Sequence, residues 1–142
     1  MIEFEQVANQ SQVEAVAGLA AEIWHQHYPA IISRQQIDYM VDRFQSIPAI
    51  RQQIDEGYHY ALIRDDGIAV GYLAIRCDAD TGALFLSKIY LREEMRGKGA
   101  GYAAMRYIAA EARARGCTSI WLTVNRMNTT AINAYERWGF RI

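Results

Sequence analysis

Three alternating glycines, Gly97, Gly99 and Gly101, stand beside Arg96 and Lys98, between a strand-like run and a helix-like run. Glycine weakens a helix by about 1 kcal/mol relative to alanine, so three glycines at a helix start need a reason. Glycines let an anion approach the backbone, and the first N–H groups of a helix have no partner within it. The two basic side chains add positive charge at the same place. This segment therefore predicts a site for a phosphate-containing ligand.

Two common phosphate-binding motifs do not fit this segment. The Walker motif requires Ser or Thr after Gly97-Lys98, where Gly99 stands. The dinucleotide motif requires a glycine at position 102, which is Tyr102, and an acidic residue near position 120, where the chain is apolar. A merely flexible loop is the remaining alternative, and the strand before it and the helix after it disfavour that interpretation.

The stretch Arg96-Gly97-Lys98-Gly99-Ala100-Gly101 resembles the acetyl-CoA signature of the GCN5-related N-acetyltransferase (GNAT) family, Arg/Gln-x-x-Gly-x-Gly/Ala. Residues 128–140 resemble the second signature of the same family. Two motifs in the right order are more specific than either alone, and the resemblance covers roughly residues 60 to 140. The N-terminal third is similar mainly in the order of its elements. Its stretch from Trp24 to Tyr28 resembles small members related to polyamine acetyltransferases.

This resemblance implies that acetyl-CoA is the cosubstrate and that no metal takes part. The backbone of the strand before the glycines would pair with the pantetheine arm, and one of its N–H groups would polarise the thioester carbonyl. The N–H groups from Gly97 to Tyr102 would hold the diphosphate. The cofactor-binding residues implied are Ile89, Tyr90, Leu91, Arg96, Gly97, Lys98, Gly99, Ala100, Gly101, Tyr102 and Asn128.

Tyr135 matches the residue that acts as the general acid in this family and protonates the departing CoA thiolate. A phenol of pKa about 10 and a thiol of pKa about 8.5 are close enough for useful proton transfer. The amine would attack the thioester directly in a ternary complex, without a covalent enzyme intermediate. The alternative for Tyr135 is a packed helix aromatic, and its spacing of seven after Asn128 favours the catalytic role.

The general base of the family does not transfer onto this chain. The positions where some members carry Glu hold Leu84 and Thr123. A water chain or a side chain from the first helices is then expected to accept the proton of the amine. The candidates on the substrate side are Glu22, Trp24, His25 and Tyr28, although Trp24 and Tyr28 suit a wall or core position equally well.

Charge is divided unevenly along the chain. Residues 1–80 carry twelve Asp or Glu and five Lys or Arg, whereas residues 81–142 carry four and ten. The basic half suits an anionic cosubstrate and the acidic half suits a cationic amine, although solvated faces without a partner are the simpler alternative. A small primary amine or a polyamine is slightly favoured as acceptor. The alternatives are a protein N-terminus or lysine, and a CoA-binding regulatory module without catalysis.

The length of 142 residues and the ordinary composition predict a single domain spanning residues 1–142. We expect a cytoplasmic protein without secretory signal, membrane span or nucleic-acid partner, because the N-terminus lacks an apolar signal core and no basic amphipathic helix is present. Cys77 and Cys117 could pair, but in that compartment they are expected to be reduced, with Cys117 buried.

The elements follow the order β-α-α-α-β-β-β-α-β-α. Strands are expected at 2–7, 59–64, 68–76, 83–91 and 120–124, with helices beginning at Ser11, Ser33, Ser46, Gly99 and Asn128. The fold class is therefore α/β with a mixed sheet, mostly antiparallel, having helices on both faces. The resemblance adds a central, splayed pair of parallel strands. Because family members continue beyond the second signature, C-terminal strands are expected to be missing, and a homodimer could complete the sheet.

Overall fold

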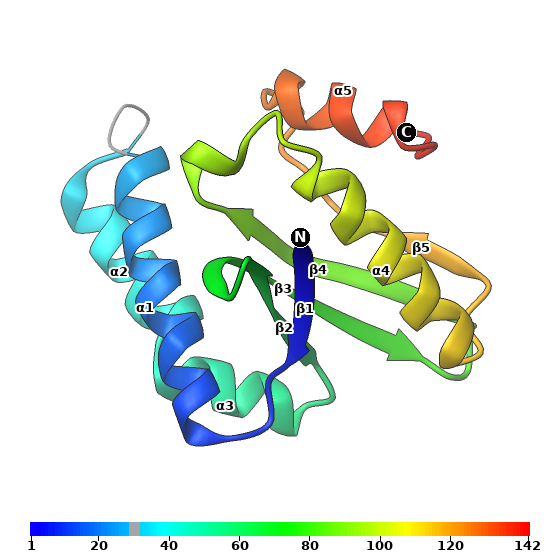
Figure 1. Cartoon of the computed structure of the whole chain (residues 1–142), viewed down its shortest axis with the longest axis horizontal. Helices are drawn as coiled ribbons and strands as arrows, with labels where there is room; N and C mark the ends of the chain where they lie inside the picture. Colours follow the sequence, from blue (N-terminus) through cyan, green and yellow to red (C-terminus); the bar gives the residue numbers. More distant parts are fainter. Residues whose placement is uncertain (29–31) are drawn as a thin grey trace.

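The computed structural model describes residues 1–28 and 32–142 and contains a five-stranded sheet with helices on both faces (Figure 1). Its strands lie side by side in the order in which they follow along the chain. The strands are β1 (Ile2–Gln6), β2 (His59–Asp65), β3 (Ile68–Asp78), β4 (Ala83–Leu91) and β5 (Ser119–Trp121). The helices are α1 (Gln10–His27), α2 (Arg34–Gln45), α3 (Ile47–Asp55), α4 (Ala100–Ala114) and α5 (Thr129–Arg137), with a 3-10 turn at Glu93–Met95.

The sheet has a hydrophobic layer on each face, and different helices pack against the two layers. Alternate strand residues such as Leu73 and Leu84 pack against α4 on one face. Their neighbours, including Leu62 and Tyr72, pack against α1 and α3 on the other face. This alternation follows from the two-residue period of a strand, so one sheet supports both layers. The predicted mixed α/β architecture is confirmed.

Side-chain caps define the first three helices. At α1 the prediction was wrong by two residues, because Asn9 rather than Ser11 is the N-cap. The Asn9 side chain accepts from the Gln12 N–H at 2.9 Å, and Gln12 reaches back to the Asn9 N–H at 3.0 Å. This reciprocal pair satisfies two N–H groups that a helix start leaves free. The predicted caps Ser33 and Ser46 are confirmed.

The β2–β3 hairpin has a two-residue turn, one residue shorter than the interval between the strands expected at 59–64 and 68–76. Asp65 pairs with Ile68, so the loop contains only Asp66 and Gly67 and no extra residue. Both loop residues have positive φ, 51° and 84°. Two successive left-handed residues form the turn whose twist matches that of the flanking strands.

The strands β4 and β5 pair in parallel over only three residues. Ala83, Leu84 and Phe85 lie opposite Ser119, Ile120 and Trp121, respectively. The predicted strand at 120–124 was therefore wrong at its C-terminal end, because the chain leaves the sheet after Trp121. Among the described residues, the remainder of β4 has a strand partner only on its β3 side. The parallel pair is therefore open along most of β4, and β5 is the outer strand of the five.

An irregularity in β4 precedes this open edge. Ala74 lies opposite Lys88 and Ile75 lies opposite Leu86, so Ser87 is an extra residue in β4. A bulge of this kind bends a strand and redirects the side chains that follow it. It lies directly before the residues expected to meet the cosubstrate.

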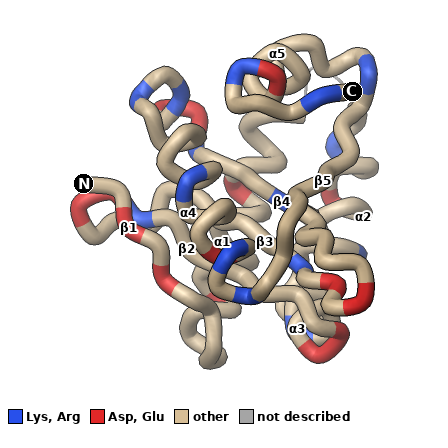
Figure 2. The backbone as a smooth tube through the Cα atoms, turned by 90° about the vertical axis from the view of Figure 1, so that its right-hand side faces the viewer, with Lys and Arg blue, Asp and Glu red and all other residues tan. Residues whose placement is uncertain are grey.

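Acidic and basic residues gather on different parts of the molecule (Figure 2). The acidic residues lie mainly around α3 and near β1, whereas basic residues lie on α4 and near the C-terminal end. This arrangement agrees with the division of charge along the sequence. None of the helices in the described ranges is long and apolar enough to cross a bilayer.

We expect Gly71→Ala in β3 to lower the free energy of unfolding by about 2 to 4 kcal/mol, because overpacking that the backbone must absorb is costly. A Cβ at Gly71 would lie 2.3 Å from the Tyr90 carbonyl oxygen and 2.9 Å from the Leu91 side chain. Urea denaturation monitored by circular dichroism measures this loss.

Gly18→Ala is the matched control, because Gly18 lies inside α1 and a Cβ there has no neighbour within 4 Å. Alanine is the better helix former, so this variant should gain about 0.5 to 1 kcal/mol. Equal stabilities for the two variants would contradict the close approach of β3 to β4.

Candidate functional site

The glycine loop forms a continuous row of backbone donors. Gly97 and Gly99 have φ values of 76° and 79°, in the left-handed region that favours glycine, and α4 begins at Ala100. The N–H groups from Gly97 to Tyr102 donate no hydrogen bond to any other described part of the chain. Free donors and the positive end of a helix dipole together suit an anion. The loop therefore has the arrangement that its sequence predicted.

Gly101 has a different reason to be glycine. A Cβ at this position would lie 2.8 Å from the Trp138 ring, which packs over the first turn of α4. Gly101 therefore allows α4 and the end of α5 to approach each other. Sequence reasoning assigned all three glycines to the ligand, because the contact with Trp138 joins residues 37 positions apart.

The open edge of β4 leads directly into this loop. Beyond Phe85, β4 has no strand partner on its β5 side among the described residues, and Ile89, Tyr90 and Leu91 lie at the end of this stretch. The turn Glu93–Met95 then connects β4 to the loop, with Met95 buried in the core. An extended ligand can therefore meet strand backbone first and the helix start second.

Tyr135 lies on α5, beside the same loop. Its ring contacts Trp138 and Phe140 edge to face, at centroid distances of 5.9 and 5.7 Å. Burial raises the pKa of Tyr135 above its ordinary value, so the phenol is protonated at neutral pH. The N-cap of this helix is Asn128, whose side-chain oxygen accepts from the Ala131 N–H at 3.2 Å. Asn128 thus has a capping role beside its expected cofactor contact.

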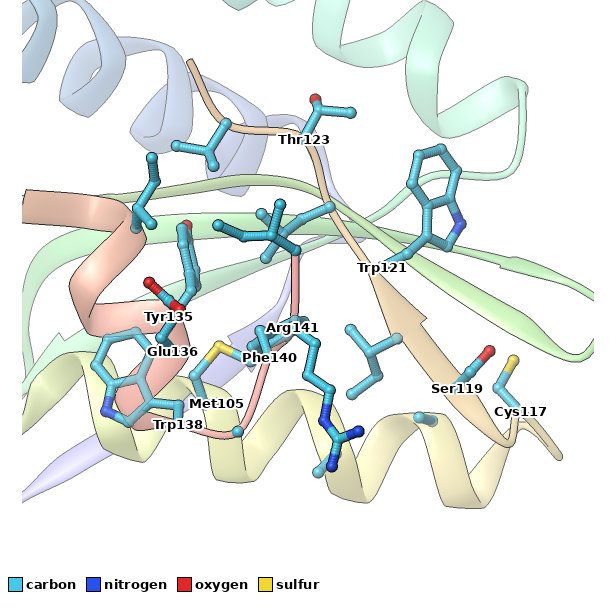
Figure 3. A pocket seen from close by; sticks show the side chains of 18 of the residues that line it. Met105, Cys117, Ser119, Trp121, Thr123, Tyr135, Glu136, Trp138, Phe140 and Arg141 are labelled. Atoms are coloured by element: carbon cyan, nitrogen blue, oxygen red, sulfur yellow. The ribbon is translucent and has the colours of Figure 1, made fainter. Parts of the chain in front are cut away.

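A cavity of about 860 Å³ lies beyond β5, between α4, α5 and the C-terminal residues. Figure 3 shows Tyr135 and Trp138 from α5 and Met105 from α4 around it, with Trp121 and Thr123 on the side of β5. Tyr135 therefore borders this cavity as well as the loop region. Of the two positions where a family base was sought, Thr123 lines the cavity and Leu84 is fully buried in the core.

A row of aromatic side chains connects α1 with the open strand. Trp24 lies 4.5 Å from Tyr28 and 5.8 Å from Tyr90, measured between ring centroids, and Tyr90 lies 5.4 Å from Tyr72. Trp24 is only 6% exposed, and its indole N–H has no hydrogen-bond partner in the described chain. Trp24 is thus mainly a core residue, whereas Tyr28 is half-buried.

Burial and the neighbouring phenols raise the pKa of Tyr90 above its ordinary value. The phenols that act on it belong to Tyr28 and Tyr135. Residues from α1, β4 and α5 therefore share one electrostatic environment, although they are up to 107 positions apart in the sequence. The sequence placed these tyrosines on separate elements and gave no signal that they meet.

Two side chains near the end of α1 contact the loop that follows β4. Glu22 forms an ion pair with Arg92 at 2.9 Å. His27 lies with Nε2 3.3 Å from the Leu91 carbonyl oxygen and Nδ1 2.5 Å from the Arg96 guanidinium. Because Arg96 only donates, Nδ1 accepts from it and Nε2–H donates to Leu91. Sequence reasoning missed His27, since only the fold brings this helix end to the loop.

His25 serves a different contact from the one expected. Its Nδ1 lies 2.6 Å from the Ala21 carbonyl oxygen and its Nε2 lies 2.8 Å from the Asp38 carboxylate. Both partners are acceptors, so a ring that carries a proton on each nitrogen satisfies both contacts. The Ala21 hydrogen bond and then the Asp38 carboxylate raise the pKa of His25. His25 therefore joins α1 to α2, and these contacts engage both of its ring nitrogens.

Comparisons with known proteins agree on one family. The model of the Acetyltransferase (GNAT) family matches residues 19–140. Streptothricin acetyltransferase of Streptomyces lavendulae is 37% identical over 81 residues, which cover 57% of this chain and 43% of that relative. The match thus spans less than half the length of this curated relative.

Solved structures have the same fold. The PaiA N-acetyltransferase from Thermoplasma acidophilum, in complex with coenzyme A, has a TM-score of 0.85 at 20% identity and covers 100% of this chain and 91% of its own. Nourseothricin acetyltransferase has a TM-score of 0.57 at 32% identity, over 62% of this chain and 52% of its own.

We expect His25→Gln to lower the stability only in acid. Because the folded-state pKa of His25 is raised, its stabilisation is fully present below the unfolded value of about 6.5 and is lost as the pH rises through the folded-state pKa. The pair is exposed, so the loss should be a few tenths of a kcal/mol. Urea denaturation from pH 5 to 9 measures it.

His59→Gln is the control with the opposite sign. Burial and then Arg115 lower the pKa of His59, so a protonated His59 destabilises the folded wild type in acid. This destabilisation disappears as the pH rises from the folded-state pKa toward the unfolded value of about 6.5. Removing His59 should therefore help in acid. Equal pH dependence in both variants would refute the His25–Asp38 contact between α1 and α2.

Proposed function

Because the chain belongs to the acetyltransferase (GNAT) family, we propose that it transfers the acetyl group of acetyl-CoA to an amine. The observation that carries the proposal is the continuity between the open edge of β4 and the free N–H groups of the glycine loop. An acyl-CoA has an amide-containing arm followed by a diphosphate, so its polar groups occur in the order that this surface offers. The coenzyme A complex of the similar PaiA structure supports the same assignment.

The diphosphate would bind at the start of α4. The backbone N–H groups of Gly97, Lys98, Gly99, Ala100, Gly101 and Tyr102 are the donors for its oxygens. The exposed Lys98 ammonium adds charge, and the Arg96 guanidinium, now beside His27, is close enough to the loop to contribute. Oriented donors that need no rearrangement bind an anion without a reorganisation cost.

The thioester would lie where β4 diverges from β5. A β4 N–H group in the region of Ile89, Tyr90 and Leu91 would polarise the thioester carbonyl, as an oxyanion site does. The amine nitrogen attacks that carbonyl, a C–N bond forms and the C–S bond breaks. Tyr135 then gives its phenolic proton to the departing thiolate, a role supported by its position on α5 and by its protonated state at neutral pH.

The acceptor would approach from the side of α1. Tyr28 and Tyr90 provide an aromatic surface there, with Trp24 packed behind them. Aromatic faces attract ammonium groups, which favours a small amine or a polyamine. Glu22 remains a candidate to take the amine proton, provided that its ion pair with Arg92 opens.

Two alternatives concern the acceptor and the chemistry. The curated relative named for streptothricin favours a small molecule over a protein N-terminus or lysine, although its match covers 43% of that protein. A CoA-binding regulatory module would retain the loop and lack turnover. One domain over residues 1–142, a cytoplasmic location and a homodimer remain predictions.

We expect Gly99→Ala to weaken acetyl-CoA binding about tenfold. Alanine in the left-handed region costs about 1–2 kcal/mol, and the loop would relieve this strain by changing its conformation, which moves the N–H groups away from the diphosphate. Gly99 has a φ of 79° at the N-terminal end of α4. Isothermal calorimetry with the folded chain measures the dissociation constant.

Gly116→Ala is the matched control, because Gly116 has a φ of 76° at the other end of α4 and a Cβ there also meets nothing within 4 Å. It should lose comparable stability and keep its affinity for acetyl-CoA within about twofold. If wild-type protein binds no acetyl-CoA, or both variants bind equally, the loop is not the diphosphate site.

We expect Tyr135→Phe to lower kcat about a hundredfold, since a general acid contributes roughly 10²- to 10⁴-fold, and to leave acetyl-CoA affinity within about threefold. The measurement is thiol release with a panel of small amines, polyamines and peptides. Tyr58→Phe, which lies before β2 and contacts Arg76, should match the wild type.

The same panel decides between the alternatives. Wild-type turnover that survives Tyr135→Phe would exclude the proposed general acid. Tight acetyl-CoA binding without turnover on any amine would instead indicate the regulatory module.

A further inference from the structure

Two cysteine thiols lie against each other on the α4 side of the sheet. Cys77 and Cys117 are the two cysteines of the chain. Cys77 belongs to β3, and Cys117 lies between α4 and β5. Their Sγ atoms are 2.8 Å apart, and both residues are free thiols. The fold thus brings together two residues that are 40 positions apart.

The surroundings hold both thiols in place. The Cys117 N–H donates to the Ala112 carbonyl oxygen at 2.8 Å, which ties this segment to the last turn of α4. Cys117 is 7% exposed, whereas Cys77 is half-buried and can be reached from solvent. A disulfide bond is about 2.05 Å long, so the sulfur atoms need to approach by less than about 1 Å to form one.

We propose that Cys77 and Cys117 are a site of reversible oxidation, at which a low-molecular-weight disulfide converts the two thiols into an intramolecular disulfide. The Cys77 thiolate attacks one sulfur of the oxidant, forms a mixed disulfide and releases one thiol. Cys117 then attacks the Cys77 sulfur and expels the second thiol. The protein loses two hydrogens, and the oxidant is reduced to two thiols.

The rate of this reaction depends on pH. Burial, followed by the neighbouring Cys117, raises the pKa of Cys77 to about 11. Glu111 of α4 and Arg115, which directly follows α4, act on it in opposite directions, and Arg115 also contacts His59 of β2 at 3.0 Å. Because the thiolate is the attacking species, oxidation should be slow near neutral pH and should become faster toward pH 10.

The cross-link would anchor β5 to the middle of the sheet. β5 pairs with β4 over only three residues, and the Thr118 and Ser119 N–H groups at its start donate to the Gly82 carbonyl oxygen at 2.7 and 3.3 Å. A bond from Cys117 to Cys77 spans β4 and joins the residue two positions before β5 to β3. It also closes a long loop in the unfolded chain, which is the condition under which a disulfide stabilises most.

Oxidation of the reduced protein with glutathione disulfide tests the proposal. After alkylation under denaturing conditions, the product should be a monomer that lacks two hydrogens and carries no alkyl group. Its melting temperature should rise by about 10 °C and return to the starting value with dithiothreitol. Cys117→Ala should form only a mixed disulfide at Cys77, Cys77→Ser should form at most a mixed disulfide at the buried Cys117, and neither should show such a rise.

Three results would overturn the proposal. The first is that both thiols are still alkylated after prolonged oxidation at pH 9 of protein that circular dichroism shows to be folded. The second is that only intermolecular dimers form, and the third is that the cross-linked protein melts no higher than the reduced protein. Because Cys77→Ser alters a half-buried residue, it provides a folded control even if Cys117→Ala is unstable. Acetyl-CoA binding takes no part in this test.

Discussion

The divergence of β4 from β5 is the constraint on which the rest of the structure depends. The two strands share three residue pairs and then separate, so within residues 1–28 and 32–142 most of β4 has no strand partner on one edge. A soluble sheet rarely leaves such an edge inside the molecule unless another group meets it. Here the edge ends at a helix start with its own free N–H groups. The strand β4 therefore offers unpaired backbone groups first and leads directly to an anion site. The cosubstrate proposal rests on this order.

The same strand also forms hydrogen bonds to the C-terminal end of α2. After the bulge at Ser87, the Lys88 ammonium donates to the Phe44 carbonyl oxygen at 2.7 Å and to the Tyr60 hydroxyl at 2.6 Å. It also reaches the Gln45 side chain at 3.2 Å, where α2 ends. Burial lowers the pKa of Lys88 to about 8, and the three acceptors compensate for the lost hydration of its charge. One side of β4 therefore faces the helices, while its open edge is the proposed site of the cosubstrate.

Local patterns predicted most of the fold because they depend on near neighbours. Caps such as Ser33, the turn at Asp66-Gly67 and the loop from Gly97 to Tyr102 are all governed by backbone geometry over a few residues. The site required more, since the contact of His27 with Arg96 joins residues 69 positions apart. The end of β5 also escaped the sequence, because an apolar run at 120–124 does not reveal where a partner strand stops pairing. Residue types alone specify neither feature.

The electrostatics of the site separate proton donation from proton acceptance. Burial raises the pKa of Tyr28, Tyr90 and Tyr135, so all three phenols remain neutral at physiological pH and can donate protons. None of them is a good acceptor for the proton of an ammonium ion, and both ring nitrogens of His25 are engaged by Ala21 and Asp38. Of the substrate-side residues expected from the sequence, only Glu22 offers a carboxylate, and Arg92 occupies it. Because Arg92 directly follows β4, whatever shifts the end of that strand also changes the availability of Glu22. In the proposed mechanism, binding at the open edge and acceptance of the amine proton by Glu22 are therefore coupled through one ion pair.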